Sequence, residues 1–371
     1  MKLFDGHLDL ALNALDHERD QTLSVSVLRE REAAGVADGR GIATVSVDEL
    51  KRGGCGVVLS TVIARAKPWV DPCRDNIHDF DWPDPSMAYA VAMGQLAYYR
   101  LLETRGLLRI IASAAQLQQH VAQWDAEPDH TSGATPVGLI LTMEGADPIV
   151  HPDQLEHWHA AGVRTLMLAH FGLSHYAHGT PATEHGRKYA QDGDGPLTDF
   201  GRLLLPKMEA LGMPLDLTHT SDQTFAEAAG LFGGRVYSSH TACRSLADMP
   251  RNHTDAQLRQ IIERDGVIGL PLFNVFLHAG YEREGGKQQV GFDVVADHIE
   301  HICQLSGDAK HVAIGSDADG GFGSEHVPAE MDTHRDIATL GEVLSRRGYS
   351  DRDVAGVLSG NWVRFFGETL P

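Results

Sequence analysis

Eight short runs of β-forming residues alternate with helical patterns along the chain, and this alternation constrains the fold more than any other feature. The runs are 2–10, 54–64, 135–145, 163–171, 212–220, 234–241, 266–273 and 310–320. The second, "GCGVVLSTVIA", is apolar almost throughout, as expected of a strand buried on both faces. Strands that alternate with helices form parallel βαβ units, and eight of them favour a closed (β/α)8 TIM barrel over an open sheet. We therefore expect an α/β fold in which residues 1–371 form one barrel domain.

The segments between these runs predict both helices and loop insertions. Helical patterns cover 151–162, 197–211, 254–265, 292–307, 331–347 and 351–359. Thr198 is the expected N-cap of the second of these helices, because a threonine hydroxyl can accept a free backbone N–H. Residues 67–87 are rich in Pro, Asp and aromatic residues, and we expect them to form an irregular loop over the C-terminal face of the barrel.

Composition bears on partners and location. The 31 basic and 51 acidic residues give a net charge of -20, which disfavours nucleic acid and anionic membrane surfaces as partners. The four cysteines form no CxxC pair, as is typical of free thiols in a reducing compartment. No apolar run approaches the ~18–20 residues of a membrane span, and neither a signal peptide before His7 nor an anchor signal in the tail is visible. We expect a soluble, cytoplasmic protein.

Side chains that commonly bind metals stand at the ends of most of the predicted strands. They are His7, Asp9, Glu144, His170, His219, His240, Asp317 and Asp319. Active sites of (β/α)8 barrels lie at the C-terminal ends of the strands, so these groups are expected to converge although they are far apart in the sequence. Any one of these histidines is more often a structural polar residue than a ligand. Their joint placement is what indicates a metal site.

The spacing of the first two suggests how a metal would be held. His7 and Asp9 stand two residues apart, which places both on one face of a strand, and a nitrogen with a carboxylate oxygen makes half of a zinc shell. His219 and His240 supply a second pair of nitrogens, and the two oxygens of Glu144 could bridge two metals. Two metals about 3.5–4 Å apart would hold a bridging hydroxide and polarise a carbonyl.

Six motifs, in order along nearly the whole chain, resemble the membrane dipeptidase (renal dipeptidase) family, peptidase family M19 of the amidohydrolase superfamily. They are "DGHLDL", "LTMEGAD", "RTLMLAHF", "GPLTDFGRLLLPKMEALGMPLDLTHTS", "VYSSHTACRSLADMPRN" and "VAIGSDADG". The resemblance implies a barrel of the metal-dependent hydrolase type with two Zn²⁺ per chain. The implied ligands are His7, Asp9 and Glu144 for one metal, and Glu144, His219 and His240 for the other.

The resemblance also implies roles for three further residues. His170 would contact the scissile group or the oxyanion, and Arg251 would bind the terminal carboxylate of the substrate, a task suited to a guanidinium. Asp317 would meet the free amine and help to move the proton. The implied activity is zinc-dependent hydrolysis of dipeptides, including those with a D-residue at the C-terminal position. Family members are often homodimers, so we expect a homodimer here.

Other functions remain open at this stage. The site could serve a different amidohydrolase reaction, such as deamination, lactone or cyclic-amide hydrolysis, or phosphotriester cleavage. Many such sites use a carboxylated lysine at the end of the fourth strand, whereas here that strand ends in "LMLAHF". A relative recruited into a biosynthetic pathway, or a metal-binding protein without turnover, is the other alternative. The presence of both Arg251 and Asp317 argues against it. Manganese, cobalt or iron could replace zinc in such a site.

Overall fold

The computed structural model of this chain describes residues 1–35, 42–67, 81–127, 129–131, 135–181 and 194–371. Most of the predicted loop 67–87 therefore lies outside the described residues. The eight predicted strands are all present: β1 (Leu3–Leu8), β2 (Cys55–Val62), β6 (Val137–Met143), β7 (Val163–Met167), β8 (Leu215–Asp216), β9 (Val236–Tyr237), β10 (Ile268–Leu270) and β11 (Val312–Ile314).

These strands pair in parallel and in the order in which they follow one another in the chain. One sheet has the order β1-β2-β6-β7-β8-β9, and β10 pairs with β11. A parallel bridge between Ser238 and Ile268 joins the two sheets. The N–H of Asp317, after β11, donates to the carbonyl of His7 at 3.2 Å, so the last strand meets the first. This arrangement confirms the predicted (β/α)8 fold class.

The strands are buried on both faces, as their composition predicts. Every residue of β2 and of β6 is buried. Glycine is required where two backbones approach closely, because a Cβ on Gly269 or on Gly315 would lie 1.8 Å from the carbonyl oxygen of Ser239. A ninth short strand, β5 (Leu108–Ile110), pairs with β6 outside the main order. A small separate pair is formed by β3 (Arg65–Ala66) and β4 (Asp81–Trp82).

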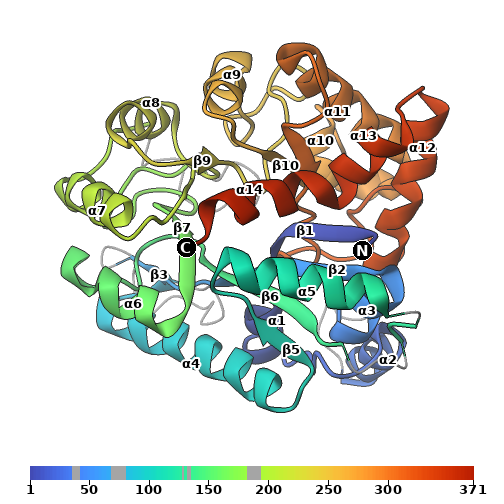
Figure 1. The fold of residues 1–371 in the computed structure, drawn as a ribbon, viewed down its shortest axis with the longest axis horizontal. Helices are drawn as coiled ribbons and strands as arrows, with labels where there is room; N and C mark the ends of the chain where they lie inside the picture. Colours follow the sequence, from blue (N-terminus) through green and yellow to red (C-terminus); the bar gives the residue numbers. More distant parts are fainter. Residues whose placement is uncertain (36–41, 68–80, 128, 132–134, 182–193) are drawn as a thin grey trace.

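Helices surround the strands (Figure 1). Four of them lie within predicted segments: α6 (Leu155–Ala161), α7 (Asp199–Ala210), α9 (Asp255–Glu263) and α11 (Phe292–Ser306). The Thr198 side chain accepts the N–H of Gly201, which confirms the predicted N-cap of α7. The helices that the sequence analysis did not assign include α1 (Leu10–Leu15), α2 (Val25–Gly35), α3 (Val47–Gly53), α4 (Pro85–Thr104), α5 (Ala114–Ala126), α8 (Asp222–Leu231) and α10 (Asn274–Leu277).

The C-terminal helices differ from their prediction. The segment predicted as 331–347 is a 3-10 helix, η5 (His334–Thr339), followed by α12 (Leu340–Arg346). The segment predicted to end at 359 begins as α13 (Asp351–Ala355), passes through a π-helical turn, η6 (Gly356–Gly360), and continues as α14 (Asn361–Thr369).

Helix α14 closes one end of the barrel. Trp362 donates its indole N–H to the carbonyl of Ile314 at 2.8 Å, and Phe366 stacks on Phe4 near the start of β1. Figure 1 shows α14 lying across the strands on the side of the two termini. Because this helix covers the N-terminal ends of the strands, the residues that follow the strands lie at the opposite end.

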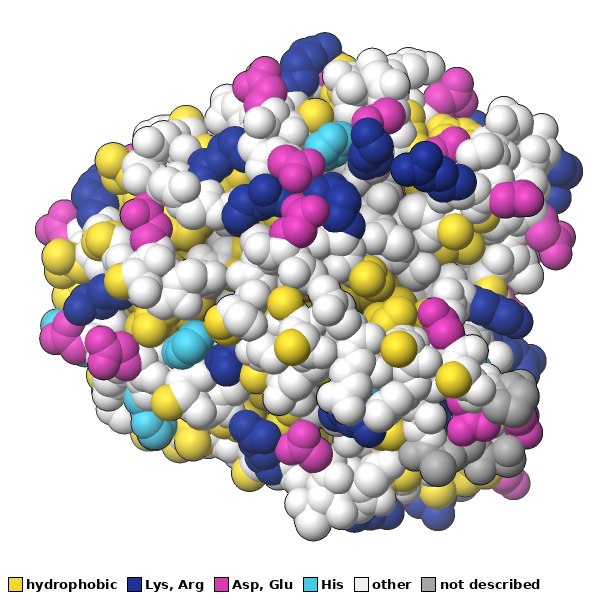
Figure 2. All heavy atoms as spheres, in the orientation of Figure 1, with side chains coloured by type: hydrophobic (Ala, Val, Ile, Leu, Met, Phe, Trp, Pro, Cys, Tyr) yellow, Lys and Arg dark blue, Asp and Glu magenta, His cyan; other side chains and the backbone are white. Residues whose placement is uncertain are grey.

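Charged groups are dispersed on the face that carries α14. Figure 2 shows acidic and basic side chains next to one another there, with hydrophobic side chains scattered among them. Among the residues that the structure describes, no helix has both the length and the apolar character needed to cross a bilayer.

Candidate metal centre

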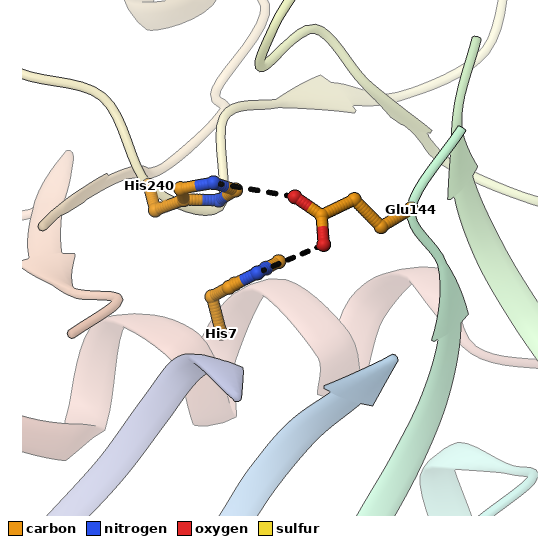
Figure 3. Close-up of side chains that lie close together, drawn as sticks. All are labelled: His7, Glu144 and His240. Carbon is orange, nitrogen blue, oxygen red and sulfur yellow. Dashed lines mark ion pairs between the residues drawn. The ribbon is translucent and has the colours of Figure 1, made fainter. Parts of the chain in front are cut away.

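Glu144 lies at the centre of a buried cluster of histidines. It follows β6, and Figure 3 shows it facing both His7, on β1, and His240, after β9, whose rings lie next to each other. Nε2 of His7 lies 3.4 Å from Oε2 of Glu144, and Nε2 of His240 lies 3.7 Å from Oε1. The two oxygens of one carboxylate therefore face two different histidines, which come from different strands.

Two further histidines approach the same carboxylate. Nε2 of His219 lies 3.3 Å from Oε1 of Glu144, and Nε2 of His170 lies 3.5 Å from that oxygen. The Nε2 atoms of His219 and His240 are 3.2 Å apart. All four predicted strand-end histidines are thus brought together around Glu144.

Two aspartates complete the cluster on the side of His7. Oδ1 of Asp9 lies 3.8 Å from Nε2 of His7, and Oδ1 of Asp317 lies 3.6 Å from it. The hydroxyl of Thr61, on β2, donates to Asp9 and orients its carboxylate.

Asp319 does not join the cluster, contrary to the expectation from its place after the eighth strand. Its carboxylate accepts the N–H groups of Thr44 and Val45 and the hydroxyl of Thr44. It also lies 3.4 Å from the guanidinium of Arg19. The role of Asp319 is therefore to hold the segment before α3.

The cluster has the donor atoms that a divalent metal requires. Three overlapping groups have their potential ligand atoms within 4.8 Å of one another: His7, Glu144 and His240; Glu144, His170 and His219; and His7, Asp9 and Asp317. Both ring nitrogens of His7, Oε2 of Glu144 and Nδ1 of His219 are buried without a hydrogen-bond partner. Buried polar atoms are normally satisfied, and imidazole nitrogens with carboxylate oxygens are the ligands that zinc and related metals prefer. The residues therefore fit a metal site.

Residues beneath the cluster support its histidines, and the sequence analysis did not identify them. Asp5 accepts the backbone N–H of His7 at 3.1 Å and a hydrogen bond from Nε2 of His334 at 2.7 Å. The hydroxyl of Ser239 lies 2.8 Å from Nδ1 of His240. The contact of Ser239 reaches the imidazole of His240, and a hydrogen bond of this kind fixes the ring orientation of a histidine ligand. Asp5 stands two residues before His7 in a buried strand, and this spacing was the signal available in the sequence.

The backbone is strained at two residues of the cluster. His219 has φ of 64° and Asp317 has φ of 58°, in the left-handed region that non-glycine residues rarely adopt. Each such residue costs on the order of 1–3 kcal/mol, and strain of this kind concentrates at functional sites.

The buried charges perturb one another strongly. Burial disfavours the charged form of His7, but the carboxylates of Glu144, Asp9 and Asp317 outweigh it and raise the pKa of His7 to about 10. Burial, assisted by Glu144, raises the pKa of Asp9 to about 7. Burial, with the nearby charge of Arg251, lowers the pKa of His219 to about 3. A site with several carboxylates and largely neutral histidines is electrostatically suited to a cation.

Arg251 borders the cluster. The residue is 4% exposed, and its guanidinium donates from Nη2 to the carbonyl of His240 at 2.7 Å and lies 3.3 Å from Nε2 of His219. The ring of Phe276, in α10, lies 5.0 Å below the guanidinium carbon. Arg251 is thus held next to the histidines by its contacts with the backbone carbonyl of His240 and the ring of Phe276.

Arg65 is a neighbour of the cluster that the sequence analysis missed. Its Nη1 lies 2.9 Å from Nδ1 of His170. Two further histidines, His175 and His178, lie on the loop after β7. The N–H of His175 donates to Asp147, and the ring of His178 contacts the carbonyl of Pro196.

Comparison with known proteins gives a consistent result. A family described as membrane dipeptidase (peptidase family M19) matches residues 1–370. An uncharacterised dipeptidase of Schizosaccharomyces pombe is 27% identical over 234 residues, which are 63% of this chain and 53% of that protein. A dipeptidase of Aspergillus terreus is 31% identical over 241 residues, which are 62% of this chain and 57% of that protein. The match spans little more than half the length of these two relatives.

Two solved structures share the fold over the whole chain. One, described as a dipeptidase and metallo peptidase of family M19, has a TM-score of 0.78 and 24% identity, and the alignment covers 99% of this chain and 98% of the other. A metallo peptidase from Rhodobacter sphaeroides, liganded with a phosphinate mimic of the dipeptide L-Ala-D-Ala, has a TM-score of 0.77 and 24% identity, with 100% and 99% covered.

Proposed function

Because this chain belongs to the membrane dipeptidase family, peptidase family M19, we propose that it hydrolyses the peptide bond of dipeptides with the help of two bound zinc ions. One observation carries the proposal: the carboxylate of Glu144 lies between two sets of buried ligand atoms. The ligands of one metal would be His7, Asp9 and Glu144, and those of the other would be Glu144, His219 and His240. When bound, such a metal pair activates water and polarises the substrate carbonyl.

The remaining residues would bind and orient the substrate. Nε2 of His170 faces the centre of the cluster and would donate a hydrogen bond to the oxygen on which negative charge develops. Asp317 is buried beside His7, and burial raises the pKa of its carboxyl well above the ordinary value. A carboxyl of this kind can carry the proton that the leaving amine nitrogen requires.

Arg251 supports dipeptides as the substrate class. A guanidinium binds a carboxylate through a pair of N–H groups, and Arg251 lies 3.3 Å from Nε2 of His219. A carboxylate held there would lie close to the proposed metal site, as the C-terminal carboxylate of a dipeptide would. The C-terminal residue of the substrate would therefore be the one that leaves.

A D-residue at the C-terminal position is part of the proposal. The metallo peptidase from Rhodobacter sphaeroides was liganded with a mimic of L-Ala-D-Ala. The extension to this chain rests on the shared family and fold. We expect dipeptides with a D-residue at the C-terminal position to be among the substrates, and L,L and L,D dipeptides should therefore be compared.

The contacts of Lys67 favour this reaction over that of amidohydrolases with a carboxylated lysine. Lys67, after β3, donates from Nζ to the carbonyls of Phe171 and Leu173. β7 is followed by His170 in place of a lysine. A glutamate from β6 would then be the bridging group.

We further infer a single catalytic domain over residues 1–371, a cytoplasmic location and a homodimer. Cys55, Cys243 and Cys303 carry free thiols in the described part of the chain, which supports a reducing compartment. The homodimer rests on the family resemblance.

Hydrolysis of a dipeptide library by the zinc-loaded protein tests the proposed function. L-Xaa-L-Xaa and L-Xaa-D-Xaa members would be compared in the same assay, with and without a chelator. We expect a subset to be cleaved and the cleavage to be lost on chelation and restored by zinc. If protein with its full complement of metal cleaves no member of the library, the proposed dipeptidase activity is rejected.

A further inference from the structure

We propose that Arg65 is a positioning residue that holds His170 as a neutral imidazole with its proton on Nε2. In this form His170 is a hydrogen-bond donor toward the substrate and is not a metal ligand. The role toward substrate rests on the proposed function, whereas the position of the proton follows from the contacts of this chain alone.

Arg65 is itself firmly placed. It lies in β3, is 3% exposed, and donates from Nε to Oδ1 of Asp81 in the paired strand β4 at 2.6 Å. Asp81 is also buried. A buried ion pair of this kind fixes the plane of the guanidinium, and Nη1 then points at Nδ1 of His170, 2.9 Å away.

In the hydrogen bond between Arg65 and His170, Arg65 can only be the donor. A guanidinium has five N–H donors and no acceptor, so Nδ1 of His170 must accept and cannot carry a proton. A charged imidazolium is excluded by the same contact, since it would place one N–H against another. The neutral ring must therefore carry its proton on Nε2.

The proton on Nε2 decides what His170 can do in the cluster. Nε2 lies 3.5 Å from Oε1 of Glu144, and His170 belongs by distance to one of the candidate metal groups. A ring nitrogen that carries a proton has no lone pair for a metal, because metals bind the deprotonated nitrogen. Arg65 thus removes His170 from the ligand set and leaves an N–H directed at the centre of the site.

The residues next to Arg65 hold the backbone that carries His170. The N–H of Ala66 donates to Asp147 at 3.0 Å, and Nζ of Lys67 donates to the carbonyl of Phe171 at 3.0 Å and to that of Leu173. Three consecutive residues therefore hold the segments after β6 and β7, and the guanidinium of Arg65 contacts the imidazole itself.

A fixed N–H donor is what stabilisation of an oxyanion requires. Catalytic donors are effective when they already point to the place where charge develops. With an apolar residue at position 65, the other tautomer would become accessible and would direct a lone pair at the oxyanion. Removal of Arg65 is therefore expected to affect turnover more than substrate binding.

The protonation of His170 can be read directly from ¹⁵N-histidine-labelled, zinc-loaded protein. Long-range ¹H–¹⁵N correlation spectra distinguish protonated from unprotonated ring nitrogens, and the His170 signals are assigned by their loss in H170Q. We expect an unprotonated Nδ1 and a protonated Nε2 in the wild-type protein. In R65M we expect this preference to be lost, zinc content to be unchanged, and kcat for a cleaved dipeptide to fall on the order of 10- to 100-fold with little change in KM.

Two variants separate tautomer control from general loosening of the site. R65K keeps a residue that can only donate, so it should retain the wild-type tautomer and recover much of kcat. K67M loosens the same segment without touching the imidazole, and the tautomer should stay as in the wild type.

An unprotonated Nε2 in the zinc-loaded wild-type protein would overturn the proposal, as would R65M with wild-type tautomer and kcat. The spectrum of the wild-type protein shows whether Nε2 is protonated, even if R65M does not fold. If no dipeptide is cleaved, the spectrum still reports the proton, so failure of the proposed function is recognised separately.

Discussion

His219 and His240 face each other through Nε2 atoms that are 3.2 Å apart, although they follow different strands. Both nitrogens also lie within 3.7 Å of one oxygen of Glu144. Two neutral imidazoles at this distance can share a single proton, whereas a metal ion would bind both lone pairs together with the carboxylate. Glu144 is thus the residue on which both halves of the proposed site depend.

Glu144→Gln is therefore expected to remove most bound zinc and to reduce dipeptide hydrolysis on the order of 10³-fold or more, since an amide cannot bridge two cations. Elemental analysis and steady-state kinetics would measure both effects. Glu49→Gln is a matched control, because Glu49 is also buried and its carboxylate accepts the hydroxyl of Thr333. Retention of zinc and activity in Glu144→Gln would exclude the bridging role.

Asp317→Asn should keep zinc and lose turnover, with kcat lower by on the order of 10²–10⁴-fold, because the amide cannot move a proton. Asp319→Asn provides the comparison: its carboxylate holds Thr44 and Val45, so this change should reduce stability and leave kcat of the folded protein near the wild-type value. Loss of zinc from Asp317→Asn would instead identify Asp317 as a ligand.

Arg251→Met should raise KM for dipeptides by on the order of 10- to 100-fold, since a hydrogen bond to a charged group contributes about 1.5–3 kcal/mol. The same substitution should make little difference for a dipeptide amide, which lacks the carboxylate. Arg244→Met is the control, because Arg244 belongs to the same segment but pairs with Asp222 on the surface. An equal loss on both substrates would contradict carboxylate recognition.

The ends of the strands could be predicted from the sequence because a general rule applies there. The residues at the ends of the β-rich runs include His7, Glu144, His219 and His240, and barrels bring such positions together. The residues that contact the cluster from outside the strand ends could not be predicted by this rule. Arg65 is one of many charged residues, and its contact with His170 depends on how the short strand β3 pairs beyond the barrel.

Asp317 and Asp319 show where the strand rule fails. Their spacing of two places them on one face of an extended strand, yet only Asp317 enters the cluster. Both have left-handed φ values, of 58° and 64°, so the chain is no longer extended at these residues. Sequence periodicity carries no information about such a turn.

Helix α14 shows a similar limit. The helical pattern predicts an end near Gly360, but the chain continues as a helix to Thr369. The side-chain amide of Asn361 donates to the carbonyls of Ala309 and Val312, each at 2.7 Å. These tertiary contacts, which join segments about fifty residues apart, outweigh the local preference of glycine.

Metal-free protein is expected to lose stability as the pH rises from 6.5 toward 10. Folding raises the pKa of His7 from 6.5 to about 10, so the folded state holds a proton that the unfolded chain releases in this interval. This contribution is complete below pH 6.5 and is lost as the pH passes through about 10. Thermal unfolding across the interval would measure it.

Zinc should remove this dependence, because the metal takes the place of the proton on His7. His7→Gln in its metal-free form should likewise show a smaller change of Tm with pH than the metal-free wild-type protein. A metal-free wild-type protein whose Tm rises over the same interval would contradict the assignment to His7.

The most direct measurement is a zinc titration of metal-free protein in which bound zinc and hydrolysis of one cleaved dipeptide are followed in the same samples. We predict that activity is absent without metal, rises with bound zinc and reaches its limit at about two zinc ions per chain. Full activity in metal-free protein, or a chain that binds its zinc and cleaves no dipeptide, would contradict a binuclear dipeptidase centred on Glu144.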